Sequence, residues 1–166
     1  IFGFTAATVT VFLSGIIGSD LSPIKTLSTL PPSIYVVGIA VSTIIAAKVM
    51  SLIGRRWGFV LAAIVGSVAC LLGAYSISQE NFILFCISCL ILGGSGAFTH
   101  QYRFAAAESV SEDKAPKAIS YLLLSGIIAG FIGISLADYT KNFFSDHMYV
   151  GSYLILSILT FLPAIF

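Results

Sequence analysis

The sequence predicts an all-α integral membrane protein, a bundle of six transmembrane helices. Of its 166 residues, 58% are hydrophobic and only 9% are charged, whereas about a quarter of the residues in a soluble domain are charged. Six nearly uncharged runs each approach the roughly 20 residues that a helix needs to cross a bilayer core. These runs are continuously apolar and do not alternate, which excludes a transmembrane β-barrel.

The six predicted spans, in chain order, are Ile1–Gly18, Ile34–Ile53, Trp57–Ile77, Phe82–Thr99, Ala118–Ala137 and Met148–Phe166. Helix-breaking residues separate them. The first gap holds Pro23 and the pair Pro31-Pro32, which suits the first turn of the second helix. Lys48 is the only charge within a span, and it lies close enough to the end to extend its amine toward the headgroups. The later gaps hold Gly54, residues 79–81, Pro116 and residues 142–147.

Basic residues in the gaps predict which ends of the spans face the cytoplasm. Those on one side, near the end of the second span and after the second and fourth spans, are Lys48, Arg55, Arg56, Arg103, Lys114 and Lys117. The gaps on the other side hold only Lys25 and Lys141. Because cytoplasmic loops carry the excess of Lys and Arg, we expect both ends of the chain to lie in the cytoplasm.

Charge and cysteine positions exclude several classes of protein. A net charge of +1 leaves no excess positive charge for a nucleic-acid backbone. Cys70, Cys86 and Cys89 lie within apolar runs, so we expect small buried hydrophobes, with no metal site and no cofactor. The segment Gly93-Gly94-Ser95-Gly96 is similar to the nucleophile motif of rhomboid proteases, but the sixth span lacks the His that would serve as its base. We therefore do not expect an enzyme.

Polar side chains within the spans are candidates for a substrate cavity. No span has an Asp or Glu near its middle, so a carboxylate for proton coupling would lie either at a helix end, at Asp20, Asp138 or Glu108, or in a part of the protein outside this sequence. Hydroxyls in the first span either face a cavity or bond back to their own helix. The candidate cavity residues are Thr5, Thr8, Ser95, Thr99, His100 and Gln101.

Small residues gather in the fourth and fifth spans. The fourth span contains Gly93, Gly94 and Gly96, and the fifth contains Gly126, Gly130 and Gly133. Faces without side chains let helix backbones approach closely in a membrane. These six glycines are therefore candidate packing positions, either for a static bundle or for helices that pack tightly while they rock against a partner bundle.

The end of the second span and the gap that follows it, residues 47–56, read Ala-Lys-Val-Met-Ser-Leu-Ile-Gly-Arg-Arg. This segment resembles the signature of the major facilitator superfamily at that place, which is roughly G-x-L-x-D-[RK]-x-G-[RK]-[RK]. Gly54, Arg55 and Arg56 match this signature, whereas Ala47 and Ser51 stand where it has its first Gly and its Asp. The resemblance covers the whole chain in topology and about ten residues in motif.

The resemblance implies one half of a twelve-helix fold. In that family each six-helix half consists of two inverted three-helix repeats, with both ends cytoplasmic. The position of the signature implies the N-terminal half, with repeats at residues 1–77 and 82–166. The sequence begins within an apolar run at Ile1 and carries no signal peptide, so we expect a piece cut from a longer chain.

The resemblance also implies a function, that of a secondary active transporter in a bacterial inner membrane. It would move a small organic solute by alternating access, with proton coupling as one option. Its partners would be membrane lipid, the solute and a second six-helix half, in the same chain or in a dimer mate. The implied cytoplasmic gate residues are Gly54, Arg55, Arg56, Arg103 and Glu108.

One alternative belongs to a different class of protein. A compact six-helix bundle with glycine-rich faces could be a membrane scaffold or assembly subunit that transports nothing. A second six-helix half in the full-length gene would favour the transporter, and a chain that ends near residue 166 would favour the scaffold.

Overall fold

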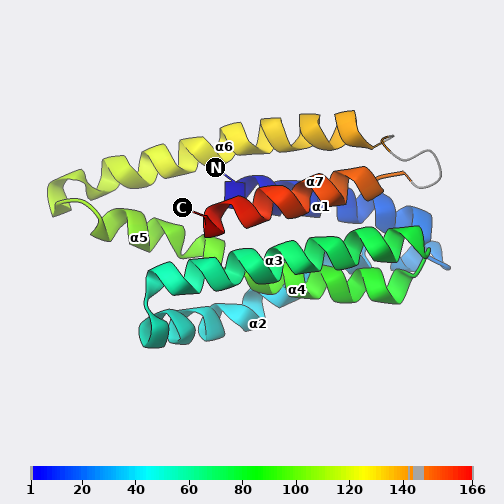
Figure 1. Cartoon of the computed structure of the whole chain (residues 1–166), viewed down its shortest axis with the longest axis horizontal. Helices are drawn as coiled ribbons and strands as arrows, with labels where there is room; N and C mark the ends of the chain where they lie inside the picture. Colours follow the sequence, from blue (N-terminus) through cyan, green and yellow to red (C-terminus); the bar gives the residue numbers. More distant parts are fainter. Residues whose placement is uncertain (1, 142, 144–147, 166) are drawn as a thin grey trace.

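The structure, a computed structural model, describes residues 2–141, 143 and 148–165. The described residues form an all-α bundle, as predicted (Figure 1). Its helices are α1 (Phe2–Leu21), α2 (Leu30–Ile53), α3 (Arg55–Ser78), α4 (Phe82–His100), α5 (Tyr102–Glu108), α6 (Ala115–Thr140) and α7 (Val150–Phe161). Short 3-10 turns lie at η1 (Lys25–Leu27), η2 (Glu112–Lys114) and η3 (Leu162–Ala164).

Five helical segments within the described residues are long and apolar enough to cross a membrane, and the sixth is shorter. The sixth predicted span began at Met148 and ran to Phe166, but α7 begins at Val150, after Tyr149 adopts a left-handed backbone (φ 71°), and ends at Phe161. Pro163 then follows within η3. Twelve helical residues rise only about 18 Å. The predicted gap at residues 142–147 lies outside the described residues except for Phe143.

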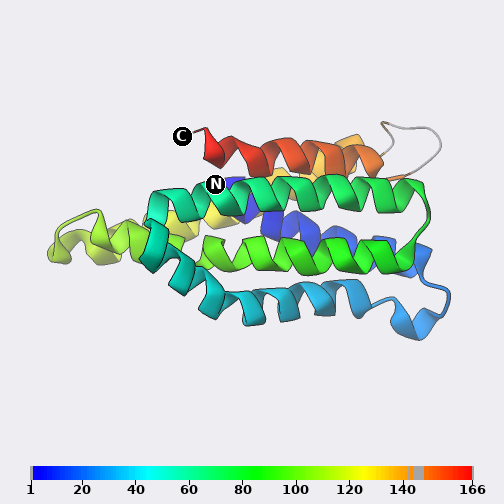
Figure 2. The same cartoon turned by 60° about the horizontal axis from the view of Figure 1, so that its bottom comes forward.

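The fourth predicted span ended at Thr99, and helical structure continues beyond it to Glu108. α5 continues from α4 after the single residue Gln101, and it contains three consecutive alanines, Ala105 to Ala107. Alanine is the strongest helix former, which accounts for the extra turns. α5 and the first turns of α6 extend together beyond the ends of the other helices (Figures 1 and 2).

Helices distant in sequence lie side by side. α2 packs against α4, α3 packs between α4 and α7, and α1 packs against α6. Figure 2 shows α3, α4 and α2 as three neighbouring rods, with α7 beside α3. The glycine-rich fourth and fifth spans are therefore packed against the second and first spans respectively.

The contact between α2 and α4 is a contact between backbones. A Cβ atom added at Gly93 would overlap the carbonyl oxygen of Tyr35, and one added at Gly38 would overlap that of Leu90. At Gly96 an added Cβ would lie 2.9 Å from the Tyr35 hydroxyl. Side chains at these positions would force the two helices apart.

The contact between α1 and α6 is tight only at Gly133. A Cβ there would lie 2.6 Å from Val9 Cγ2 and 2.8 Å from Thr5 Cγ2. At Gly126 the nearest atom would be 3.5 Å away, on Phe4, and at Gly130 it would be 3.6 Å away, on Thr8; both are ordinary van der Waals distances.

Serine hydroxyls join α3 to its neighbours. Ser88 of α4 donates to the carbonyl oxygen of Ala69 at 2.9 Å, and Ser67 lies 2.9 Å from the Ser157 hydroxyl of α7. Hydrogen bonds between helices are favoured where no water competes for the groups. α3 is thus tied to the helices on both of its sides.

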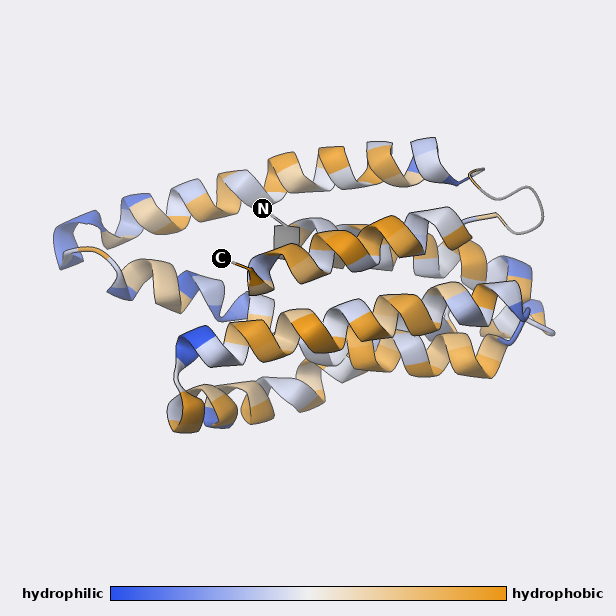
Figure 3. Cartoon of the chain, viewed as in Figure 1, coloured by the Kyte–Doolittle hydropathy of each residue, from blue (hydrophilic) through white to orange (hydrophobic). Residues whose placement is uncertain are grey.

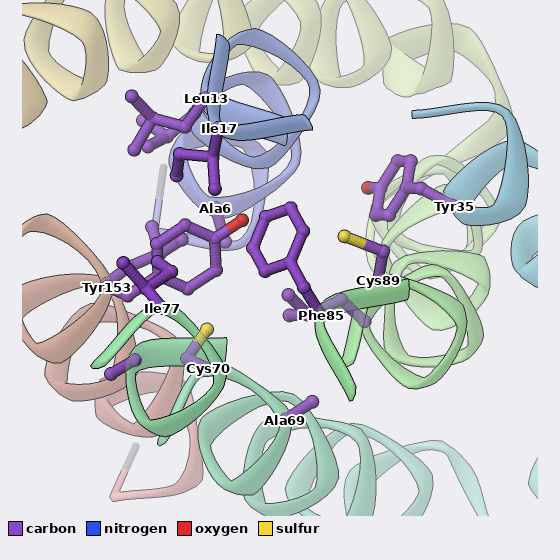
Figure 4. Close-up of a cluster of buried hydrophobic side chains, with 14 of the residues drawn as sticks. Ala6, Leu13, Ile17, Tyr35, Ala69, Cys70, Ile77, Phe85, Cys89 and Tyr153 are labelled. Carbon is purple, nitrogen blue, oxygen red and sulfur yellow. The ribbon is translucent and has the colours of Figure 1, made fainter. Parts of the chain in front are cut away.

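The core lies where α1, α3, α4 and α7 converge. Tyr153 and Phe85 are fully buried there, with their ring centroids 5.7 Å apart in an edge-to-face arrangement (Figure 4). Figure 4 also shows Tyr35 of α2 reaching toward Cys89. Cys70, Cys86 and Cys89 are buried free thiols, as expected of small hydrophobes.

Apolar residues also cover the outside of the bundle. Figure 3 shows hydrophobic residues along the lengths of the helices and hydrophilic ones at their ends. The spans that contain α2 and α6 are the least buried, with large exposed side chains such as Ile44 on α2 and Phe131 on α6. This distribution is that of a protein surrounded by lipid.

The glycine contacts predict a difference between two Gly→Ala variants. Gly93→Ala should lower the free energy of unfolding by about 1–3 kcal/mol, since a backbone has to move to admit the methyl group. Gly130→Ala is the matched control, because its methyl group meets only an ordinary contact. Thermal unfolding of the full-length protein in detergent measures both. Equal melting temperatures for the two variants would contradict the close approach of α2 and α4.

Candidate functional site

The turn between α2 and α3 consists of one residue, Gly54. Its φ of 85° lies in the region that disfavours side chains, and its N–H donates to the carbonyl oxygen of Met50, the last such bond of α2. Glycine is therefore required for α3 to begin directly at Arg55. The neighbouring Ser51 is exposed and donates its hydroxyl to the carbonyl oxygen of Lys48 at 2.8 Å, within its own helix.

Arg55 forms an ion pair and a hydrogen bond with Glu108. The pair joins the first residue of α3 to the last residue of α5, 53 positions further along the chain. The side chains are 38% and 65% exposed, so water and salt weaken the attraction. The Arg55 Nη1 atom is buried and has no hydrogen-bond partner.

The other two candidate gate residues are not part of this pair. Arg56 and Arg103 are exposed, and neither has an ion-pair partner among the residues that the structure describes. The structure thus brings together Gly54, Arg55 and Glu108, and it leaves Arg56 and Arg103 facing outward at the same end of the molecule.

Tyr102 lies where α4 gives way to α5. Its ring packs 4.7 Å from that of Phe59 on α3 and 6.2 Å from that of Phe4 on α1, between centroids. Tyr102 was not among the candidate site residues. The residues around Tyr102 in the sequence do not indicate that its ring contacts rings from two distant helices.

A small cavity lies in the middle of the bundle, with a volume of about 30 Å³. Residues from α1 to α5, α7 and η3 line it, and its hydroxyl groups belong to Thr10, Tyr35, Ser95, Thr99, Tyr102 and Thr160. The Thr10 hydroxyl is buried without a hydrogen-bond partner, whereas Ser95 donates to the carbonyl oxygen of Ala62 at 2.8 Å. The space suits about one water molecule and is well below the roughly 300–1,000 Å³ of a pocket for an organic ligand.

The six candidate cavity residues lie in different environments in the structure. Ser95 and Thr99 line the small cavity. Thr5 is buried against Gly133, and Thr8 donates to the Phe4 carbonyl oxygen of its own helix at 3.1 Å. His100 is exposed and Gln101 is half-buried at the break between α4 and α5. The six candidates did not include Thr10 and Tyr35, which line this cavity, because helical phase alone does not show which face of a helix turns inward.

Carboxylates line an opening at the opposite end of the bundle from Gly54. Its volume is about 330 Å³, and its walls include Asp20, Glu80 and Tyr149. The third helix-end carboxylate, Asp138, accepts a hydrogen bond from Lys141 at 2.6 Å, which raises the pKa of that amine. No group of three His, Cys, Asp or Glu residues that could hold a metal ion occurs among the described residues.

Comparison with known proteins gives two findings. Residues 1–166 match the Major Facilitator Superfamily. The chain is also 33% identical, over 166 residues, to the riboflavin transporter RfnT of Brucella anthropi. This alignment covers 99% of the chain and 42% of the relative's length. No solved structure gives a match. Because the family match extends over every residue, the chain belongs to the Major Facilitator Superfamily.

Proposed function

We propose that the chain forms the N-terminal half of a secondary active transporter that moves a small organic solute by alternating access. The observation that carries this proposal is the pairing of Arg55 with Glu108 at the signature turn. Arg55 lies on α3, in the proposed first three-helix repeat, and Glu108 lies on α5, in the proposed second repeat. An ion pair that fastens the two units at one end is suited to a gate, since it can form in one conformation and break in the other.

Glu108 supplies the carboxylate that the signature lacks in this chain. The signature has an Asp where Ser51 stands, and the Ser51 hydroxyl is engaged with its own helix. Glu108 reaches the same turn from α5 and meets the Arg55 guanidinium. We therefore assign the gate to Gly54, Arg55 and Glu108, and give Arg103 a supporting charge at the same end.

The helix contacts support inverted repeats at residues 1–77 and 82–166. Exchange of the two repeats would map α1 onto α4, α2 onto α6 and α3 onto α7. The contact between α1 and α6 then becomes the contact between α4 and α2, and both contacts are present and built on glycine. The contact between α3 and α7 maps onto itself.

The solute would lie between this bundle and a second six-helix half, in the same chain or in a dimer mate. The central cavity holds about 30 Å³, too little for an organic solute. The exposed face of α1 would instead form one wall of the solute site. On this face Val11 and Phe12 are each 47% exposed, and Gly15 faces open space. The length of the relative RfnT, of which the chain spans 42%, leaves room for such a second half.

Riboflavin is the first solute to test, since the relative RfnT is named for it and is 33% identical. The full-length protein should support uptake of radiolabelled riboflavin in a bacterial strain that cannot make it, and excess unlabelled riboflavin should compete. A protonophore tests proton coupling in the same assay. Uptake equal to that of the empty vector would reject riboflavin, and failure with a broad panel of solutes would favour a scaffold.

Loss of the gate ion pair should slow uptake. Arg55→Gln and Glu108→Gln should each reduce the uptake rate by up to about fivefold, the effect expected of a partly exposed pair. The charge-reversed double variant, Arg55→Glu with Glu108→Arg, should recover part of the loss. Arg56→Gln is the matched control, since it removes a neighbouring charge that has no ion-pair partner among the described residues. An Arg56→Gln effect as large as that of Arg55→Gln would remove the pair from the gate.

Cysteine labelling tests the proposed orientation in a bacterial inner membrane, with both ends cytoplasmic. Single cysteines at Ser19 and Ser111, both exposed, should react with a membrane-impermeant maleimide from outside and from inside respectively. The three native cysteines are buried, so the background should be low. The reverse labelling pattern would overturn the assignment from basic residues.

A further inference from the structure

The exposed tryptophan and tyrosine side chains lie at regular positions on two helices. Among the residues that the structure describes, they are Trp57 and Tyr75 on α3 and Tyr121 and Tyr139 on α6. Their exposed fractions lie between 57% and 92%, whereas the remaining tyrosines are buried or half-buried. The two members of each pair are separated by 18 positions in the sequence.

This spacing places the two rings of a pair on one face of their helix. Eighteen residues make about five full turns of an α-helix and rise about 27 Å. On α3 the face points out of the bundle, because the buried Gly66, which packs against Ser95, lies about two and a half turns from each ring. On α6 the buried Gly133 packs against α1, and the two rings lie outside that contact.

The two pairs mark the same two ends of the bundle. Figure 1 shows α3 and α6 running in the same direction. Trp57 and Tyr121 are therefore at the end where the chain turns at Gly54, and Tyr75 and Tyr139 are at the opposite end. The exposed rings thus fall at two levels, and each helix gives the same distance between them.

Charged residues begin where the rings end. On α3 no charge lies between the two rings, and Arg56 directly precedes Trp57. On α6 the one charge between the rings is Asp138, next to Tyr139, and it accepts a hydrogen bond from Lys141 beyond that ring. Figure 3 shows hydrophobic residues along the stretches between these levels. The apolar length of both faces is therefore the distance between their rings.

We infer that the protein is matched to a bilayer whose hydrocarbon core is about 25–27 Å thick, with its boundaries at the levels of these rings. Tryptophan and tyrosine are favoured at the headgroup level, where an apolar ring and a polar tip meet both environments. A typical tilt of about 20° shortens 27 Å along the helix to about 25 Å across the membrane.

A bilayer also explains why the exposed rings are confined to two levels. Contact with another protein gives no reason for tryptophan and tyrosine to be exposed only at the two ends of an apolar face, whereas a bilayer has one interface at each end. The inferred core is slightly thinner than the roughly 30 Å of a typical bilayer. This inference does not depend on which solute is transported.

Spin labels on the full-length protein in phosphatidylcholine bilayers test the boundaries on α3. Single labels are placed with Trp57→Cys, Ile64→Cys, Val68→Cys and Tyr75→Cys, all at exposed positions. Collisions with oxygen, which concentrates in hydrocarbon, should be most frequent at the two central positions, and collisions with a water-soluble nickel chelate should be most frequent at the two ends. The deepest point should fall within about one turn of residue 66.

The same measurement on α6 is an independent repeat. Labels at Tyr121, Ile128, Ile132 and Tyr139, which are all exposed, should give a deepest point within about one turn of residue 130. The three native cysteines of the chain are buried, which keeps background labelling low.

The thickness itself is tested by thermal unfolding of the full-length protein in phosphatidylcholines of increasing chain length. The melting temperature should be highest at a core of about 25–27 Å and lower on both sides, because hydrophobic mismatch has a free-energy cost. Trp57→Leu with Tyr121→Leu removes the rings at one boundary and should flatten this maximum. Phe131→Leu is the matched control, since it removes a ring that is 75% exposed in the middle of α6, and it should leave the maximum unchanged.

Three results would overturn the inference. A deepest point more than one turn from residue 66 or residue 130 would show that the rings do not mark the boundaries. Infrequent oxygen collisions at either central pair of labels would show that protein covers that face. An equal maximum in the wild type and the Trp57→Leu, Tyr121→Leu variant would show that the rings do not set the thickness.

Discussion

The close approach of α2 to α4 is the constraint on which the rest of the bundle depends. Within a bilayer, apolar side chains gain little by leaving lipid for protein, so association rests on close packing and on hydrogen bonds between helices. Gly38 and Gly93 permit that packing by bringing two backbones into direct contact. The position of α4 then sets the positions of α3, which packs on it, and of α7, which packs on α3.

Much of this architecture follows from the sequence, because a bilayer allows few alternatives. Backbone groups in hydrocarbon need partners within the same segment, so long apolar runs become helices. The runs around residues 34–53 and 57–77 therefore gave helices with nearly the predicted ends, and the positive φ of Gly54 explains the sharp break between them. The fourth predicted span ended at Thr99 because the residues that follow are polar, whereas the alanines of α5 extend the helical structure to Glu108.

The site was less predictable for a physical reason. Whether a hydroxyl lines a cavity depends on the rotation of its helix and on the neighbour it meets. Thr5, Thr8 and Thr10 share one helix, yet the first is buried against α6, the second bonds to its own backbone and only the third reaches the central cavity. Likewise, Arg55 and Arg56 are adjacent in sequence, and their different environments arise from the position of α5.

The single-residue turn at Gly54 makes α2 and α3 one mechanical unit. Arg55, which pairs with Glu108, is the first residue of α3 and follows the turn directly. Under the proposed function, the ion pair and the transported solute bias the same conformational equilibrium, and such coupling is reciprocal. A conformation that breaks the ion pair therefore moves α2 and α3 together, and the affinity for the solute changes with the state of a contact that the solute does not touch.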